Sequence, residues 1–229
     1  MRKSLTAKKR ESRPLRVLEA TSRIMVRYGF DKTTMQDIAR EAGVSKGALY
    51  LEWSSKEDLF EALIIHEMRV LLLELRARLA DQQDCSLAQL YALTLECMQR
   101  SPLICALYTR DTSILGDFIH HQDPDRYVRR LLLSQENVRS MQQAGLLRTD
   151  LSAEVISHLF MLNAIGLLSI NNVIPTEKSP PLAETIQGIA AMVQSGLTLP
   201  AQASTGFKEA AITMLDLMLA QYKENHHEN

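Results

Sequence analysis

Residues 33–60 read TTMQDIAREAGVSKGALYLEWSSKEDLF, and this stretch determines the fold that we expect at the start of the chain. Thr33 can cap a first helix whose third position is Gln36, which is the Thr-x-x-Gln form of a capping box. Gly43 follows where this helix must end, because a residue without a Cβ atom tolerates a positive φ at little cost. Ser45 is a favourable N-cap for a second short helix. Two short helices joined by a glycine turn predict a helix-turn-helix unit, which is a DNA-binding arrangement.

The longer pattern around these helices resembles the DNA-binding domain of the tetracycline-repressor (TetR) family. The matching residues are Thr33-Thr34, Asp37-Ile38-Ala39, Ala42-Gly43-Val44-Ser45, Gly47-Ala48-Leu49-Tyr50, Trp53 and Ser55-Lys56-Glu57-Asp58-Leu59. Beyond the first helices the resemblance concerns only the number and length of helical segments. It implies contacts with phosphates or base edges from the N-terminal ends of helices. The residues expected to make these contacts are Thr33, Thr34, Gln36, Ser45, Lys46, Gly47, Ala48, Leu49, Tyr50 and Lys56.

Leu51 and Glu52 depart from the family pattern, which often places basic or aromatic residues beside the phosphates at this point. Glu52 would repel a phosphate if it faced DNA. Two interpretations remain open: Glu52 faces the DNA, or it points sideways into solvent. We favour the second.

The charge of the chain is distributed unevenly. The total is −1, but residues 1–56 contain 13 Lys and Arg against 6 Asp and Glu, a net charge of +7, while the remainder contains 13 against 21, a net charge of −8. The basic end is the helix-turn-helix end, and Lys8-Lys9-Arg10 would form a basic arm beside it. This division fits a phosphate-binding end joined to a part with another function.

The three cysteines, Cys85, Cys97 and Cys105, form no C-x-x-C pair, and no Lys or His lies next to Cys97 or Cys105 to lower its pKa. Packing is therefore favoured over oxidant sensing. The polar N-terminus lacks the apolar stretch of a signal peptide, and no window approaches the uninterrupted apolar length of a membrane span. We expect a cytoplasmic protein with reduced thiols.

The rest of the chain shows helical periodicity without sustained strand alternation. The expected helices are Pro14 to Tyr28, Ser55 to Asp81, Ser86 to Arg100, Pro102 to Ile119 with a break near Gly116, Pro124 to Ala144, Ser152 to Asn172, Leu182 to Ser195 and Thr205 to Tyr222. The sequence thus predicts an all-α protein. Residues 1–54 would form an N-terminal arm and a three-helix helix-turn-helix domain, and residues 55–229 a helical bundle for effector binding and dimerisation.

Catalytic and metal sites are poorly supported. His120-His121, with Asp123 and Asp125, resembles a metal cluster in composition only, because adjacent helical residues point in different directions and no His-x-x-x-His pair is present. A polar connecting loop is the favoured interpretation. No G-x-S-x-G, P-loop or dinucleotide fingerprint occurs. We therefore expect no catalytic residues, no metal and no cofactor.

The resemblance to the TetR family also implies an effector cavity among the helices between Leu90 and Val138. Large or polar side chains on these apolar helices, and one on the helix from Ser152, would line it and orient a ligand. The candidates are Tyr91, Met98, Tyr108, Phe118, Gln135 and Asn163, each of which taken singly is more typical of plain core. Methionine-rich walls repack easily, so we expect a small, largely apolar effector.

The helix from Ser152 to Asn172 is nearly all apolar, which predicts a subunit interface as well as core. We expect it to pair with its symmetry mate together with the helix from Thr205 to Tyr222, and Leu182 to Ser195 could substitute for either. The resulting hypothesis is a homodimeric, ligand-responsive transcriptional regulator, a repressor released from a palindromic operator by a small molecule. The alternatives are a helical protein-interaction module without DNA binding and an all-α enzyme with a cryptic site.

Overall fold

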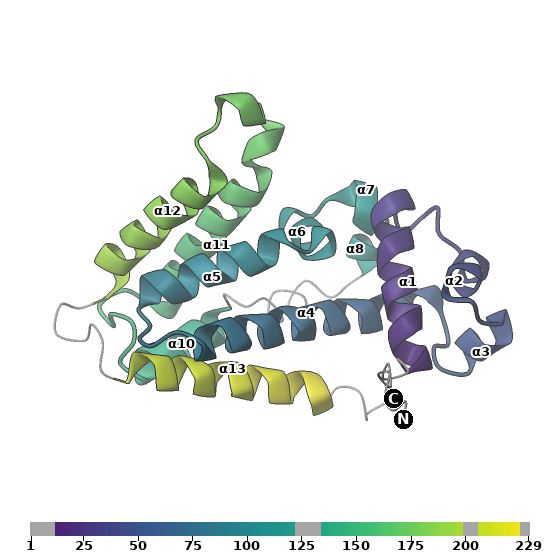
Figure 1. Cartoon of the computed structure of the whole chain (residues 1–229), viewed down its shortest axis with the longest axis horizontal. Helices are drawn as coiled ribbons and strands as arrows, with labels where there is room; N and C mark the ends of the chain where they lie inside the picture. The colour runs from purple at the N-terminus through teal and green to yellow at the C-terminus, as the bar shows by residue number, and fades with distance from the viewer. Residues whose placement is uncertain (1–11, 122–133, 199–205, 225–229) are drawn as a thin grey trace, which may run out of the picture.

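The computed structural model describes residues 12–121, 134–198 and 206–224, and the regular elements within these ranges are all helical. The predicted all-α architecture is confirmed. Figure 1 shows an elongated molecule, with the first three helices at one end and the remaining helices in a bundle that extends away from them. A single long helix, α4, connects the two parts.

The first three helices form the N-terminal domain. They are α1 (Arg13–Tyr28), α2 (Met35–Ala42) and α3 (Lys46–Tyr50). α1 has Pro14 in its first turn, where the missing N–H group leaves no hydrogen bond unmade. Its buried face, with Val17, Ile24 and Met25, packs against α2 and α4. α2 in turn contacts α3, so α1 and α4 together support the helix-turn-helix unit.

The cap of α2 lies one residue later than predicted. Thr34 is the N-cap: its hydroxyl accepts the N–H of Asp37 at 3.2 Å, and the Asp37 carboxylate accepts the N–H of Thr34 at 3.2 Å. Thr33 is buried instead and donates its hydroxyl to the carbonyl of Gly29 at 2.7 Å. The predicted Thr33–Gln36 capping box was therefore wrong, because the adjacent Thr34–Asp37 pair has the same spacing and forms the box.

The turn between α2 and α3 agrees with the prediction. Gly43 has a left-handed conformation with φ 66°, and the N–H of the next residue, Val44, returns to the carbonyl of Ala39 at 3.0 Å. Ser45 caps α3, with its hydroxyl accepting the N–H of Ala48 at 3.2 Å. The orientation of α3 is thus fixed by local hydrogen bonds on both sides of the turn.

The long helix α4 (Lys56–Ala80) is the central element of the molecule. Its N-terminus is capped by Ser55, whose hydroxyl accepts the N–H of Asp58 at 3.0 Å. Apolar side chains are buried along its whole length, from Leu59 to Leu79. One side of α4 is thus covered along its whole length, and the helix contacts α1, α5, α6 and α13.

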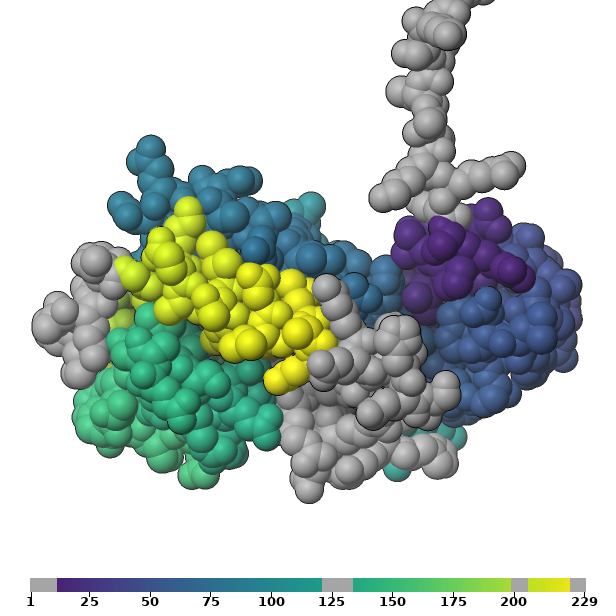
Figure 2. All heavy atoms as spheres, turned by 90° about the horizontal axis from the view of Figure 1, so that it is seen from below, coloured from purple at the N-terminus to yellow at the C-terminus, as the bar shows by residue number. Residues whose placement is uncertain are grey.

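The last helix, α13 (Phe207–Glu224), lies alongside α4, as Figures 1 and 2 show from two directions. Arg76 of α4 forms a two-pronged ion pair with Asp216 of α13, at 2.5 and 3.0 Å. The ammonium of Lys208 donates to the carbonyl of Ala80 at 2.8 Å, at the C-terminal end of α4. These contacts attach α13 to the half of α4 that is distant from the N-terminal domain.

The next segment folds into α5 (Leu87–Gln99), α6 (Pro102–Thr109), α7 (Thr112–Leu115) and α8 (Phe118–His121). The single helix predicted from Pro102 is interrupted twice. Arg110 has a φ of 52°, and Asp111 caps α7 by accepting the N–H of Ser113 at 2.8 Å. The predicted break near Gly116 is confirmed, since this glycine has a φ of 51° and ends α7. The sequence did not predict the break at Arg110, because its only local sign is the single N-cap residue Asp111.

The bundle is completed by α10 (Gln135–Gln143), α11 (Ala153–Ser169) and α12 (Leu182–Leu197). Two 3₁₀ turns, Ile170–Asn172 and Thr176–Lys178, connect α11 to α12. α10 packs against α11, and α12 packs against α5. The first part of the helix predicted from Pro124 lies outside the described residues. In Figure 1 the connected ends of α11 and α12 stand clear of the other helices.

The segment Ala153–Asn172, which is α11 with the turn after it, is long and apolar enough to cross a membrane by length and composition alone. The expectation that no stretch approaches a membrane span was therefore wrong. α11 contacts α6 and α10, but only 33% of its apolar window is buried in the protein. The uncovered part of this helix is an apolar surface that a second protein chain could cover.

An aromatic cluster joins the N-terminal domain to the bundle. The ring centroids of Phe30, Phe60 and Phe118 lie between 4.5 and 5.4 Å apart. The Lys56 ammonium lies 4.0 Å from the centroid of the Phe30 ring and donates to the Phe30 carbonyl at 2.9 Å. The N–H of Phe30 donates to the carbonyl of Ile114 at 2.8 Å. A rotation of the N-terminal domain against the bundle would have to rearrange this cluster.

Candidate DNA interface and effector cavity

The N-terminal end of α3 presents an exposed polar surface. Ser45, Lys46 and Gly47 are exposed, and Tyr50 is 48% exposed. The Lys46 ammonium lies 5.8 Å from the centroid of the Tyr50 ring, so the two side chains occupy the same side of the helix. They offer an ammonium group and a phenol hydroxyl next to each other, which are both groups that bind phosphates or base edges.

Gly47 has open space where a Cβ atom would lie, with no atom within 4 Å, and its φ is not positive. Neither steric crowding nor backbone conformation within the protein therefore requires a glycine here. Gly43 differs, because its positive φ is strained for other residues. The missing side chain at Gly47 instead leaves room for another molecule to approach the backbone of α3.

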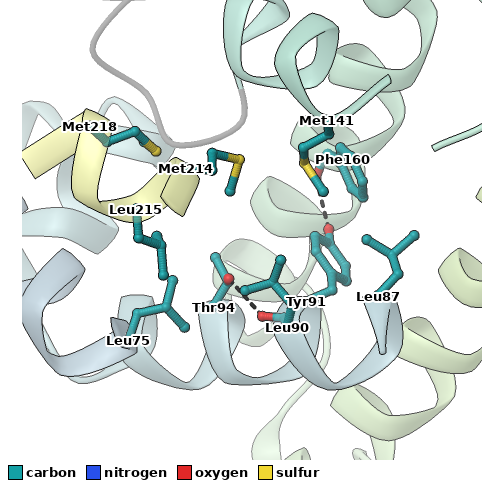
Figure 3. Close-up of a pocket in the computed structure, with 10 residues that line it drawn as sticks. All are labelled: Leu75, Leu87, Leu90, Tyr91, Thr94, Met141, Phe160, Met214, Leu215 and Met218. Carbon is teal, nitrogen blue, oxygen red and sulfur yellow. Dashed lines mark hydrogen bonds between the residues drawn. The ribbon is translucent and has the colours of Figure 1, made fainter. Parts of the chain in front are cut away.

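An apolar cavity of about 40 Å³ lies within the bundle, between α4, α5, α10, α11 and α13 (Figure 3). Its lining residues are Leu75, Leu87, Leu90, Tyr91, Thr94, Met141, Phe160, Met214, Leu215 and Met218. Figure 3 shows Met141 and Met214 projecting into the space beside Tyr91 and Thr94. A space of this size holds one or two small groups. A drug-sized ligand would enter only if the flexible methionine side chains moved.

Two hydroxyl groups are the polar features of this cavity. Tyr91 donates its hydroxyl to the carbonyl of Phe160 at 3.0 Å, and Thr94 donates to the carbonyl of Leu90 at 2.8 Å. Both protons are used within the protein, so each oxygen offers only acceptor capacity to a ligand. Burial raises the pKa of Tyr91 well above its ordinary value, which keeps the phenol neutral. The cavity therefore suits an apolar group with at most a hydrogen-bond donor.

Comparisons with known proteins agree with this geometry. The family model of bacterial regulatory proteins of the tetR family matches residues 17–63, which span α1 to the first turns of α4. The HTH-type transcriptional regulator UidR of Escherichia coli is 25% identical over 198 residues, covering 80% of this chain and 92% of UidR. Residues 17–63 of the chain thus match the DNA-binding domain of the TetR family.

Two further relatives show how this TetR-family similarity is distributed. The HTH-type transcriptional regulator YfiR of Bacillus subtilis is 38% identical over 64 residues, which cover 28% of this chain and 31% of YfiR. The crystal structure of FadR from Bacillus subtilis in complex with stearoyl-CoA superposes with a TM-score of 0.60 over 80% of this chain and 98% of FadR, at 13% identity. Sequence similarity is thus highest at the N-terminus, and the bundle shares chiefly its fold.

The residues predicted to contact DNA differ in how far they are exposed. Six are exposed on or beside α2 and α3: Thr34, Gln36, Ser45, Lys46, Gly47 and Tyr50. Thr33 and Leu49 are buried in the core of the domain, where they support α2 and α3 from inside. Ala48 is half-buried, and the Lys56 ammonium is engaged with Phe30. Leu51 and Glu52 are both exposed directly after α3.

Of the six residues predicted to line the effector site, only Tyr91 lines the cavity. Met98 and Tyr108 are buried elsewhere in the core, and Phe118 belongs to the aromatic cluster at the domain junction. Gln135 is exposed and accepts a hydrogen bond from Arg139, and Asn163 donates to the carbonyl of Leu159 on its own helix. These five assignments are not supported by the geometry.

The sequence interpretation missed the contributions of α13. Met214, Leu215 and Met218 line the cavity, although the apolar side of this helix had been assigned to a dimer contact. Their signal was present as apolar spacing of three and four residues, but such spacing does not say which neighbour covers the face. Whether this face lies in the monomer core or in a dimer contact depends on where α4 and α10 lie. The spacing of apolar residues within one helix gives no information about that.

Cys85 and Cys97 are buried and Cys105 is half-buried. Burial raises the pKa of the Cys97 thiol, and this effect outweighs Arg78, whose guanidinium donates to the sulfur at 3.7 Å. Burial likewise raises the pKa of Cys105, and it raises that of Cys85 to about 11. Arg78 is a nearby cation that sequence neighbours could not reveal, because it lies 19 residues away. The raised pKa values favour the protonated form of all three thiols at neutral pH.

Among the described residues, no group of three His, Cys, Asp or Glu side chains is placed to hold a metal ion. Asp123 and Asp125, half of the cluster considered from the sequence, lie outside the described residues, as do Lys8-Lys9-Arg10. The candidate functional features of the described residues are thus the exposed end of α3 and the cavity of the bundle.

Proposed function

We propose that this protein is a homodimeric transcriptional repressor of the TetR family that leaves a palindromic operator when a small, largely apolar molecule enters the cavity of the bundle. The observation that supports the proposal is that one continuous helix joins the two sites. α4 begins at Lys56, against the aromatic cluster of the N-terminal domain, and contributes Leu75 to the cavity. The two positions are 19 residues apart, which corresponds to about 28 Å of helix. A ligand that shifts Leu75 therefore acts on the element that orients α3.

The DNA-binding part of the proposal rests on the exposed end of α3. Ser45, Lys46, Gly47 and Tyr50 would contact the major groove, with Thr34 and Gln36 of the α2 region beside them. Two copies of this surface would occupy half-sites about 34–36 Å apart, which is the separation of successive major grooves. The separation of the two α3 helices must equal the separation of the two half-sites for both to bind. A small rotation of each N-terminal domain is therefore enough to prevent binding at both half-sites.

The dimer contact that we propose uses α11 and α12. Val155, Leu159 and Leu162 form a row on one side of α11 and are 47%, 38% and 55% exposed. Gly166 continues this row with open space at its Cβ position, so a second helix can approach closely. On α12, Met192 is 63% exposed. The two helices would meet their symmetry mates in a four-helix contact.

The apolar residues of the last helix that were expected to pair with a symmetry mate are mostly covered within the monomer. Leu215, Met218 and Leu219, which motivated its pairing with a symmetry mate, are buried within the monomer. Leu215 and Met218 line the cavity, and the burial of all three residues needs no second chain. We therefore assign the partner of α11 in the dimer contact to α12, the alternative that the sequence left open.

The mechanism that we propose is a population shift between two arrangements of the N-terminal domain. A ligand shifts this equilibrium only by the difference between its affinities for the two arrangements. A preference of about 3 kcal/mol would change operator affinity by roughly 150-fold. A regulator of this kind acts on chromosomal DNA, so we place it in the cytoplasm and assign it no enzymatic activity.

The proposal is tested by selecting random DNA duplexes with the purified protein and measuring operator affinity with and without hydrophobic compounds that raise its melting temperature. We expect a palindromic site, binding that weakens steeply with added salt through counterion release, and release by at least one compound. Binding that shows no salt dependence and no site preference would favour the protein-interaction module instead. A monomer in sedimentation at micromolar concentration would contradict the dimer.

A further inference from the structure

A groove of about 290 Å³ runs between α10 and α13, on the outer side of the cavity described above. Figure 2 shows the two helices side by side on this face of the molecule. The groove is several times larger than the inner cavity of about 40 Å³. Together the two spaces reach the lower end of the volumes at which proteins bind small molecules, about 300–1,000 Å³.

Two methionines of α13 separate the groove from the inner cavity. Met214 and Met218 line both spaces. Met218 is 5% exposed and Met214 is half-buried, so their side chains form the partition rather than the outer surface. Methionine is unbranched and has three rotatable bonds, so it can change rotamer at little cost. Rotation of these two side chains would join the groove and the cavity into one channel.

The polar groups of the groove are all uncharged. Asn137 and Ser140 face it from α10, and Thr213 and Gln221 face it from α13. Ser140 donates its hydroxyl to the carbonyl of Glu136 at 3.0 Å, and Thr213 donates to that of Glu209 at 2.9 Å, so both oxygens retain acceptor capacity. No Lys, Arg, Asp or Glu belongs to the described walls. An ionised ligand head would meet no countercharge among the described residues that line the groove.

We propose that the effector is an uncharged, single-chain amphiphile. Its head, an amide or a group of similar hydrogen-bonding capacity, lies in the α10–α13 groove against Asn137, Ser140, Thr213 and Gln221, and its apolar chain passes between Met214 and Met218 into the inner cavity. This inference rests on the proposed function, because it concerns the ligand of the same regulator. A free carboxylate or a coenzyme A thioester binds less well, since the described residues of the groove offer hydrogen-bond partners for a neutral amide but no cationic partner for an anion.

Calorimetric titration of the full-length protein with a matched series tests the ligand class. The probes are hexanamide, octanamide and decanamide, together with decanoate and decylamine at pH 7.5. We expect affinity to rise severalfold for each added methylene, because each one moves apolar surface out of water. We expect decanamide to bind at least about tenfold more tightly than either charged compound of the same length, since an unpaired charge costs more than a neutral amide to desolvate.

Two variants test the groove and the partition. Gln221→Leu removes an amide from the groove and should weaken decanamide about tenfold, whereas Gln143→Leu makes the same change at an exposed position of α10 outside the groove and should have no effect. Met214→Trp should block the channel, so that hexanamide and decanamide bind equally. Met214→Leu keeps the volume and hydrophobicity and should retain the dependence on chain length; it serves as the control for folding.

The outcomes separate this inference from the function on which it rests. Decanoate binding as tightly as decanamide, or equal effects of Gln221→Leu and Gln143→Leu, would overturn the neutral amphiphile. If another compound then releases the operator, the regulator itself stands. If no compound in the hydrophobic screen releases the operator, the ligand-responsive function fails and the inference fails with it.

Discussion

The end of α3 and the cavity of the bundle differ in their exposure and in how many helices contribute to each. The groups on α3 are exposed, lie within one short segment and are oriented by local hydrogen bonds around Gly43 and Ser45. The cavity is buried and assembled from five helices, whose walls are held together by apolar packing with a few long-range polar contacts such as that of Tyr91 with Phe160. Truncation of the exposed side chains at the first site should therefore change binding without changing stability, whereas truncation of side chains that line the cavity should change both.

The largest expected effect contrasts two aromatic residues. Phe60 is fully buried in the cluster at the domain junction, and Tyr50 is half-exposed on α3. Phe60→Ala should lower the free energy of unfolding by about 3–5 kcal/mol, because it leaves a cavity among packed rings. Tyr50→Ala should change it by less than about 0.5 kcal/mol while weakening operator binding. Urea denaturation of both variants measures the difference, and equal losses of stability would remove the distinction between the two regions.

A smaller effect concerns charge on the DNA side. Lys46→Ala should weaken binding by roughly similar factors on all operator variants and reduce the salt dependence by about one counterion, as expected for one lost phosphate contact. Glu52→Gln is the matched control, because it also removes one charge beside α3. Its operator affinity should stay unchanged if Glu52 points into solvent. Tighter binding by Glu52→Gln would show that this carboxylate faces the DNA after all.

Two glycines of the helix-turn-helix unit should respond in opposite directions. Gly47→Ala replaces glycine within a helix and should stabilise the protein by up to about 1 kcal/mol, since its Cβ meets open space. Gly43→Ala forces alanine into the left-handed conformation and should destabilise the protein by about 1 kcal/mol. Thermal denaturation gives both signs. Operator affinity should fall for Gly47→Ala despite its greater stability, and unchanged affinity would contradict close approach of the DNA backbone.

The smallest effect is a pH dependence at the start of α2. Hydrogen bonds from Thr34 lower the pKa of Asp37 below its ordinary value of 3.8. The lowered value means that this carboxylate stabilises the folded state above pH 3.8 and that the contribution is lost as the pH falls through the folded-state pKa. The difference in melting temperature between the wild type and Asp37→Asn should therefore shrink between pH 6 and pH 3. A difference that stays constant over this range would exclude the coupling.

The two regions also differ in how far the sequence predicted them. The turn around Gly43 and the cap at Ser45 could be predicted because each depends on residues within five positions. Even there, the buried sides of Thr33 and Leu49 were not distinguished from the exposed positions beside them. The cavity could not be predicted, because its walls converge only after α13 folds back onto α4. Tyr91 and Met214 are 123 positions apart, and no local pattern relates them.

Linkage between the two regions is the central claim, and it is measured most directly by the affinity of one operator-releasing compound for the free protein and for the protein saturated with operator DNA. Coupling through α4 requires both ligands to weaken each other by the same factor, because linkage between binding equilibria is reciprocal. We therefore expect the compound to bind the DNA complex more weakly, by the factor with which it reduces operator affinity. Equal affinity for the free and the DNA-bound protein would contradict the account.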